Sequence, residues 1–258
     1  MLRGARPRHQ RLRTVGWARF PVCHFGESAM NGRQDSMIWI EEGPFTMGSD
    51  LYEIEGPVRQ VFVLGFWIDR LPVTHAEFFA YVQDTGAPMV PDWPADGPGA
   101  DIANYPVERV SWQEARDYAA WCGKRLPTEV EWEKAARGTD GREWPWGDEL
   151  IEEHMNVWDS AKPTNVMTIA NGSRLGNVSP YGVIDMSGNV EEWVEDLFLP
   201  YEGGTSNFPS TQGNCRVLRG GSWFYTNEMA RCSFRRGALP TFSGYERAGG
   251  PGFRCAQS

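Results

Sequence analysis

The sequence predicts a single α+β domain with little regular secondary structure. Three motifs that start helices lie between residues 74 and 131, whereas helical periodicity is absent after Gly147. The 258-residue chain contains 29 glycines and 18 prolines, which favour turns and loops. A hydrophobic fraction of 41% with 12 tryptophans indicates a packed core. We therefore expect a compact, loop-rich globule whose working surface lies on its loops.

The first 36 residues differ in charge from the rest of the chain. Residues 1–36 carry seven arginines against Glu27 and Asp35, a balance of +5, whereas residues 37–258 carry 18 basic and 32 acidic side chains, a balance of −14. The Arg/Pro/Gly composition of residues 1–36 predicts a basic flexible extension. Because Met30 and Met37 precede the first patterned segment, a start codon assigned too early is an alternative. We place the folded domain at residues 37–258.

The acidic body excludes some classes of partner. Nucleic acid is disfavoured, because affinity for phosphates comes from clustered lysine and arginine. No apolar run reaches the length that spans a membrane, so we expect no membrane partner. The four histidines, at positions 9, 24, 75 and 154, lack the spacing of transition-metal ligands.

The cysteines predict neither a zinc site nor a dense disulfide framework. Their number is odd, and no C-x-x-C pair occurs; they are Cys23, Cys122, Cys215, Cys232 and Cys255. We therefore expect reduced thiols and a cytoplasmic location. Neighbouring arginines would favour thiolate at Cys232 and Cys255, but the apolar residues around both favour buried, inert thiols.

Strands are expected in the first part of the domain. The segment MIWIEEGPFTMGSD (37–50) is typical of a strand, a turn at Gly43–Pro44 and a second strand. The segment VFVLGFWIDR (61–70) is rich in branched and aromatic residues and predicts one further strand. Residues 84–106 are rich in proline and glycine and predict an ordered loop or a surface excursion.

Three capping boxes predict three helices. They are THAE at 74–77, SWQE at 111–114 and TEVE at 128–131. In each, the first hydroxyl accepts from the backbone N–H three residues on, and the glutamate reaches back to the first N–H. Gly138 is a suitable stop for the third helix.

Oxygen-bearing side chains are concentrated in YGVIDMSGNVEEWVED (181–196). They are Asp185, Asn189, Glu191, Glu192, Glu195 and Asp196. Gly188 permits a tight turn, and such loops can bind a hard cation through carboxylates and carbonyls. The spacing is not that of an EF-hand, so from these residues alone an acidic, solvated turn is the simpler interpretation.

The segment from residue 216 to the C-terminus is rich in arginines and aromatic residues. Its arginines could bind a carboxylate or phosphate, although a structural role is the simpler interpretation for most of them. Its aromatic residues are hard to bury together in so irregular a stretch, which indicates an aromatic binding surface. No Ser/His/Asp set can be assigned, so catalysis through histidine has little support.

Taken together, these motifs resemble the formylglycine-generating enzyme (sulfatase-modifying factor) family. The matching segments are FTMGSD, PVT (72–74), PV-x-x-VSW (106–112), GKRLPTEVEWEKAARG, WPWGD, SPYGVIDMSGNVEEW, RVLRGGSW and GFR. They run in family order from residue 37 to the end of the chain. The resemblance implies a single formylglycine-generating-enzyme-type domain with a C-type-lectin-like fold.

The resemblance also implies structural calcium. Matched position by position, Asp185 and Glu192 supply side chains, and Gly188 and Val190 supply carbonyls. A second family site begins at Asn156 and the carbonyl of Val157. Its later acidic ligand has no clear counterpart in DSAKPTNVMT.

A copper site, by contrast, is not expected. The family enzyme oxidises a substrate cysteine with oxygen at a copper ion held by two cysteines after the GGS motif. Tyr225 stands at the first position, and the second falls in a short deletion near Met229–Ala230. These side chains cannot replace two thiolates, which are the ligands that Cu(I) prefers. Cys232 and Cys255 match family disulfide cysteines whose partners correspond to Ala119 and Ala136.

Two functions of different classes follow from the resemblance. In the first, the chain is a non-catalytic module, such as a variable protein of a diversity-generating retroelement, that binds a peptide, protein or small-molecule ligand after GGSW. The ligand-binding residues would be Trp223, Phe224, Tyr225, Thr226, Asn227, Arg235, Phe242, Tyr245 and Arg254. The alternative is a divergent oxidoreductase or tailoring enzyme of this family that works without a two-cysteine copper site.

Overall fold

The N-terminal strands form two small antiparallel sheets. The computed structural model describes residues 36–258 apart from residues 92, 159–166 and 245–248. One sheet has the order β1 (Met37–Ile40), β4 (Phe66–Asp69) and β9 (Ala256–Gln257), so its last strand comes from the C-terminus. The other is a ribbon of β2 (Gly43–Met47) and β3 (Arg59–Val63).

The segment predicted as one strand over 61–70 is instead split between two sheets. β3 ends at Val63, and β4 begins at Phe66. Gly65, between them, lies against the indole of Trp39, where an added Cβ would sit 2.5 Å from the ring. The chain therefore changes sheet at a glycine that packs closely against Trp39, a tertiary contact that the strand-like composition does not reveal.

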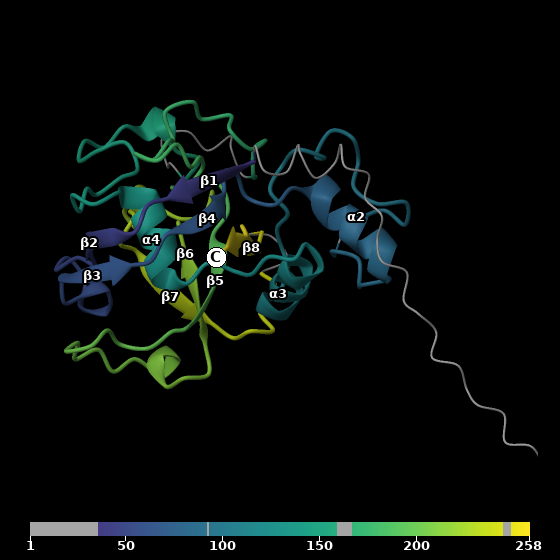
Figure 1. Cartoon of the computed structure of the whole chain (residues 1–258). Coiled ribbons are helices and arrows are strands. Elements are labelled where there is room, and N and C mark those ends of the chain that lie inside the picture. Colours follow the sequence, from purple (N-terminus) through teal and green to yellow (C-terminus); the bar gives the residue numbers. More distant parts are fainter. Residues whose placement is uncertain (1–35, 92, 159–166, 245–248) are drawn as a thin grey trace, which may run out of the picture. The chain divides into compact units, whose positions relative to one another are not determined.

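The three predicted helices are confirmed, each with both hydrogen bonds of its capping box. They are α2 (His75–Thr85), α3 (Trp112–Trp121) and α4 (Glu129–Arg137), and α4 ends at Gly138 as expected. Figure 1 shows α2 and α3 at one side of this body, and α4 beside the N-terminal strands at the other. Among the described residues, no helix is long and apolar enough to cross a membrane.

The C-terminal half builds a four-stranded sheet between irregular loops. Its order is β7 (Arg235–Ala238), β6 (Arg216–Arg219), β5 (Glu192–Leu197) and β8 (Gly252–Phe253), with β8 parallel to β5. Short 3₁₀ helices are η1 (Glu53–Glu55), η2 (Glu152–His154), η3 (Pro209–Thr211) and η4 (Asn227–Ala230). The mixed helices and sheets confirm the predicted α+β class.

This sheet separates two hydrophobic cores. Val194 and Val217 pack with Trp132 of α4 and with the N-terminal strands. Trp193 and Leu218, their neighbours in sequence, face the opposite way and pack with α2 and α3. Successive strand residues point to opposite faces, so β5 and β6 support helices on both sides and form a rigid base for the loops that follow.

Candidate ligand-binding surface and cation-binding loops

Two glycines fix the chain direction after β6. Gly220 and Gly221 have φ values of +86° and +65°, in the left-handed region that favours glycine. A Cβ on Gly221 would lie 2.4 Å from the carbonyl oxygen of Met229, so only glycine lets the two segments pass this closely. The aromatic residues after Ser222 therefore leave the sheet along a fixed path.

The structure exposes some of the predicted aromatic ligand residues and buries others. Trp223 is buried, Tyr225 is half-buried, and Phe224 is 45% exposed. Trp158, which the sequence analysis missed, joins this surface: it is 39% exposed, and its backbone N–H donates to the Tyr225 carbonyl at 2.8 Å. No pattern in the sequence around residue 158 signals this contact, because the pairing joins segments far apart in the chain.

Tyr225 and Phe242 are brought together around one arginine. The Arg236 guanidinium lies 5.7 Å from the centre of the Tyr225 ring and 5.4 Å from that of Phe242. Its Nε donates to Oε2 of the buried Glu191 at 2.7 Å. An ion pair thus positions two of the predicted ligand-binding rings, and Arg236 has the structural role that the sequence favours for most arginines of this segment.

Arg235 and Arg254 have a different environment from the one predicted. We expected them to be available for a ligand carboxylate, but both are buried and paired within the chain. Arg235 makes two hydrogen bonds to Glu129, at 2.7 and 2.8 Å, and Arg254 makes two to Glu192, both at 2.7 Å. Because these carboxylates already neutralise them, neither arginine is available to a ligand carboxylate, and both have a structural role inside the fold.

The remaining predicted ligand residues lie along the same segment. Thr226 is exposed, and Asn227 opens η4, where its Oδ1 accepts from the Glu228 backbone N–H at 2.8 Å. Tyr245 lies outside the described residues. Beneath Trp223 lies Glu108, a carboxyl whose pKa is raised by burial, although the Trp223 indole and the Gly250 amide oppose the rise.

The first predicted calcium set contains two carboxylates that repel each other. Burial raises the pKa of Asp185 to about 6; the Gly172 amide and the Arg254 guanidinium oppose the rise, and the charge of Glu192 adds a smaller part to it. A divalent cation would relieve this cost, so Asp185 fits calcium. Glu192 also accepts from Arg254 and from the Trp132 indole, so a cation here would share Glu192 with a guanidinium.

The second predicted calcium set offers an unused buried oxygen. Asn156 Nδ2 donates to the Met167 carbonyl and to Asn189 Oδ1, both at 3.1 Å, which orients the amide. Its Oδ1 is then buried without a hydrogen-bond partner among the described residues. Such an oxygen suits a hard cation. The two sets adjoin, because Asn156 and Gly188 form a β-bridge.

The thiols of Cys232 and Cys255, in the C-terminal segment, are buried. Cys232 and Cys255 are both free cysteines without solvent exposure. Burial raises the pKa of Cys232 to about 12 and that of Cys255 well above its ordinary value. Tyr225, at the first copper position, is a ring that carries no thiolate. In the part of the chain that the structure describes, no three His, Cys, Asp or Glu side chains lie together as metal ligands.

Comparison with known proteins identifies the family. A family model described as sulfatase-modifying factor enzyme 1-like domain matches residues 24–258. The chain is 34% identical over 283 residues to inactive C-alpha-formylglycine-generating enzyme 2 of Bos taurus, covering 88% of this chain and 89% of that protein. It is 33% identical over 282 residues to formylglycine-generating enzyme of Thermomonospora curvata, covering 85% and 92%.

Solved structures of similar fold support the same family. The structure of PvdO from Pseudomonas aeruginosa superposes with a TM-score of 0.68 at 29% identity, covering 86% of this chain and 94% of that one. Treponema denticola variable protein 1 gives a TM-score of 0.67 at 21% identity with the same coverage, which shows a shared fold. The predicted fold type is confirmed, and the chain belongs to the formylglycine-generating enzyme (sulfatase-modifying factor) family.

Proposed function

We propose that this protein is a ligand-binding member of the family and that its ligand packs on the surface formed by Trp158, Phe224 and Tyr225. The carrying observation is that Phe224, on the segment after GGS, and Trp158, on the segment paired with it, both stay exposed, at 45% and 39%. Gly221, the Arg236–Glu191 pair and the Trp158–Tyr225 hydrogen bond give these segments a rigid base. Exposed aromatic residues on a rigid base bind ligands with a low entropic cost.

Loss of the two copper thiolates supports binding over oxidation. A relative of similar length, the Bos taurus protein, carries the word inactive in its name. The present chain lacks cysteine at both positions where the family holds copper, and burial keeps Cys232 in its unreactive thiol form. We extend the non-catalytic role to this chain on these grounds.

Calcium is proposed as a structural ion of the loops at 156–157 and 185–192. At the first site Asp185 and Glu192 would supply carboxylates, and Gly188 and Val190 carbonyls. At the second, Asn156 would supply its unused Oδ1 and Val157 its carbonyl. Bound to the folded state alone, calcium would stabilise the loop that precedes β5. β5 pairs with β6, and the ligand surface follows β6 in the chain. Calcium in the loop before β5 would therefore support the surface indirectly, through this pair of strands.

A tailoring enzyme without the copper pair is the second candidate. Glu108 favours it, because a buried carboxyl with a raised pKa beside Trp223 has the character of a general acid or base. The two candidates differ in their requirement for Glu108: Glu108→Gln should abolish a reaction but leave binding at Phe224 intact.

The test is selection of displayed random peptides on the immobilised protein. A selected peptide should bind Phe224→Ala and Trp158→Ala more weakly by about 2 kcal/mol, roughly 30-fold in Kd, because a central aromatic contact is lost. Phe62→Ala is the matched control, since Phe62 is 63% exposed on β3, outside this surface. Equal binding to Phe224→Ala, Trp158→Ala and wild type would exclude the surface.

A further inference from the structure

Two cysteines lie close to the contact between the end of α3 and the last strand. Cys122 caps the C-terminal end of α3 and is partly exposed, whereas Cys255 joins β8 to β9 and is fully buried. Arg125 and Ala256 form an antiparallel bridge, with backbone hydrogen bonds of 3.0 and 2.7 Å. The bridge holds the turn after Cys122 against the strand that begins after Cys255.

The side chains of both cysteines enter one hydrophobic cluster. Cys255 belongs to the core around α2 and α3, and Cys122 packs against that core. Tyr118, one helical turn before Cys122, donates its hydroxyl to the Cys122 sulfur, and its pKa is raised by burial and by charges that include those of both cysteines. Burial likewise raises the pKa of Cys255, and the charge of Cys122 adds to the rise. The two thiols therefore interact electrostatically and share Tyr118 as a neighbour.

The Cys255 thiol faces an ion pair. It donates to the Asp69 carboxylate, whose Oδ2 also accepts from the Cys255 backbone N–H at 2.9 Å. Oδ1 of Asp69 accepts from Lys124 Nζ at 2.5 Å. Burial opposes the charge of Lys124, but Asp69 outweighs burial and raises the Lys124 pKa. Asp69 thus offers the Cys255 proton a carboxylate that an ammonium group holds in place.

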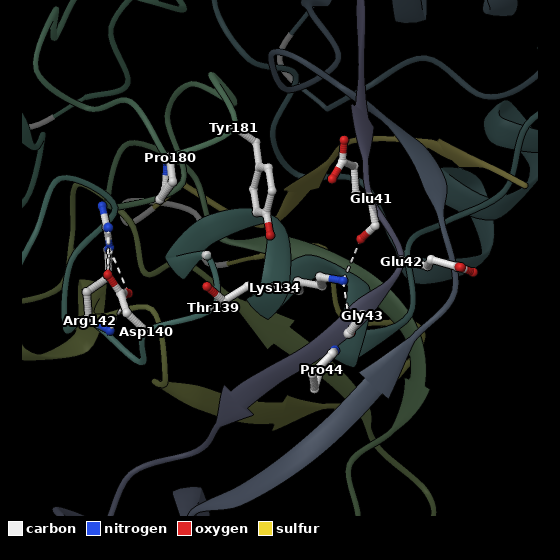
Figure 2. Close-up of a pocket in the computed structure, with 11 residues that line it drawn as sticks. Glu41, Glu42, Gly43, Pro44, Lys134, Thr139, Asp140, Arg142, Pro180 and Tyr181 are labelled. Atoms are coloured by element: carbon white, nitrogen blue, oxygen red, sulfur yellow. Dashed lines mark hydrogen bonds and ion pairs between the residues drawn. The ribbon is translucent and has the colours of Figure 1, made fainter.

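The other lysine in the described part of the chain shows what Asp69 contributes. Lys134 reaches across a cavity of about 340 Å³ at the end of α4, and its Nζ donates to two backbone carbonyls, the nearer being that of Glu41 at 2.6 Å (Figure 2). Burial lowers the pKa of Lys134, although nearby glutamates oppose this. The opposite shift at Lys124 shows that Asp69 and Lys124 form a charged pair beside Cys255.

We propose that Cys122 and Cys255 are a redox-sensitive pair: a low-molecular-weight disulfide oxidises Cys122, and Cys255 then closes a disulfide with it. The partial exposure of Cys122 lets the reagent reach it, and the burial of Cys255 reserves the second thiol for its neighbour. The site uses no residue of the surface formed by Trp158, Phe224 and Tyr225, so the proposal is independent of the proposed function.

Two exchange steps complete the reaction. In the first, the Cys122 thiolate, favoured by the Tyr118 hydroxyl, attacks one sulfur of the small disulfide; a mixed disulfide forms, and the other half leaves as a thiolate and takes up a proton. In the second, the Cys255 sulfur attacks the Cys122 sulfur while its proton passes to Asp69, and the remaining half leaves and takes that proton. The two cysteines lose two electrons and two protons, and the small disulfide becomes two thiols.

The new bond would tie the C-terminal segment to α3. Cys255 lies between β8, in the four-stranded sheet, and β9, in the sheet with β1 and β4, so its segment joins both sheets. A link between Cys122 and Cys255 closes a long loop and restricts mainly the unfolded chain. Oxidation should therefore raise the melting temperature by about 5–10 °C.

The experiment treats the full-length protein with glutathione buffers of increasing oxidised fraction. The remaining thiols are then alkylated in denaturant, and the protein is digested with trypsin without reductant. The peptides DYAAWCGK (117–124) and CAQS (255–258) should be recovered joined by a disulfide, whereas Cys215 and Cys232 should be alkylated. Excess reduced glutathione should restore both thiols and the lower melting temperature.

Three variants test the parts of the pair. Cys122→Ser should leave Cys255 alkylated and make the melting temperature independent of the oxidised fraction. Cys215→Ser, the matched control, should form the link as wild type does. Asp69→Asn, which keeps the size of the side chain but not its charge, should slow the second step, so that the glutathione adduct accumulates on Cys122.

Three results would overturn the proposal. One is a glutathione adduct that persists on Cys122 of wild type while Cys255 is recovered alkylated. Another is a disulfide from Cys122 to Cys23 or Cys215 in place of the expected one. The third is a Cys122 thiol that stays reduced across the whole series of buffers.

Discussion

Arg219 of β6 and Glu133 of α4 form an ion pair without solvent exposure, with 2.5 Å between Nη2 and Oε2. The other oxygen of Glu133 accepts from the Gly48 backbone N–H and from Arg137. Three family motifs that lie far apart in sequence, FTMGSD, EWEKAARG and RVLRGGSW, therefore meet at one carboxylate. This contact holds the start of the ligand segment against the helix.

Removing that carboxylate should destabilise the fold strongly. Glu133→Ala leaves the Arg219 guanidinium buried without its main counter-ion, so we expect a loss of about 3–5 kcal/mol in the free energy of unfolding. Urea denaturation checks this, with Glu153→Ala on the exposed face of η2 as control. Equal losses for both variants would show that the buried pair has no special role.

Ionisation of Asp185 should lower the stability of the calcium-free protein as the pH rises, and bound calcium should offset this loss. Its pKa is raised from 3.8 to about 6, so without calcium its contribution is fully present below pH 4 and is lost as the pH rises through about 6. At pH 7 in chelator, Asp185→Asn should be more stable than wild type by about 2–3 kcal/mol.

Calcium should reverse this order, because the ionised Asp185 is then paired with the ion. Thermal unfolding of both proteins with calcium and with chelator measures the effect. If calcium raises the melting temperature of wild type and Asp185→Asn equally, Asp185 is not a ligand.

His75 should make the protein less stable as the pH falls from 6.5 to 4. Burial lowers its pKa from 6.5 to about 4, and its Nδ1 accepts from the Trp93 indole at 3.0 Å, which requires the neutral ring. As the pH falls from 6.5 to 4, the unfolded chain takes up a proton that the fold excludes, and up to about 3 kcal/mol is lost. The difference in unfolding free energy between wild type and His75→Phe should therefore shift against wild type over this range. A difference independent of pH would contradict the assignment.

Cys232 should be inert in the native state. A thiol with a pKa raised to about 12 and no exposure forms almost no accessible thiolate at neutral pH. Brief treatment with a maleimide, followed by peptide mass mapping, should modify the partly exposed Cys122 before Cys232, which should react only after denaturation. Rapid labelling of Cys232 in the folded protein would contradict its burial.

The local parts of the fold could be predicted from the sequence. The three capping boxes are contacts within four residues, so Thr74, Ser111 and Thr128 specify their helices directly. The split between β3 and β4 falls at Gly65, which packs against Trp39 of another strand, a contact that composition does not encode. The isolated 61–70 segment therefore looked like one strand.

The candidate site was predictable in outline only. The aromatic residues after GGS were identified because their types stand out, but burial separates Trp223 from Phe224. The partners of the arginines could not be read from the chain: Arg235 and Arg254 face Glu129 and Glu192, which are more than 60 residues away. Trp158 becomes a neighbour of this segment only in the folded structure.

The most direct test of the central claim, that this segment binds and does not oxidise, is a turnover assay. The protein is incubated with Cu(I), oxygen and a cysteine-containing sulfatase peptide, and the peptide is followed by mass spectrometry, with an active family enzyme as positive control. We predict that the cysteine peptide is recovered unchanged, because neither Tyr225 nor Met229 can provide a copper thiolate. Conversion of the peptide cysteine to the aldehyde would contradict the account.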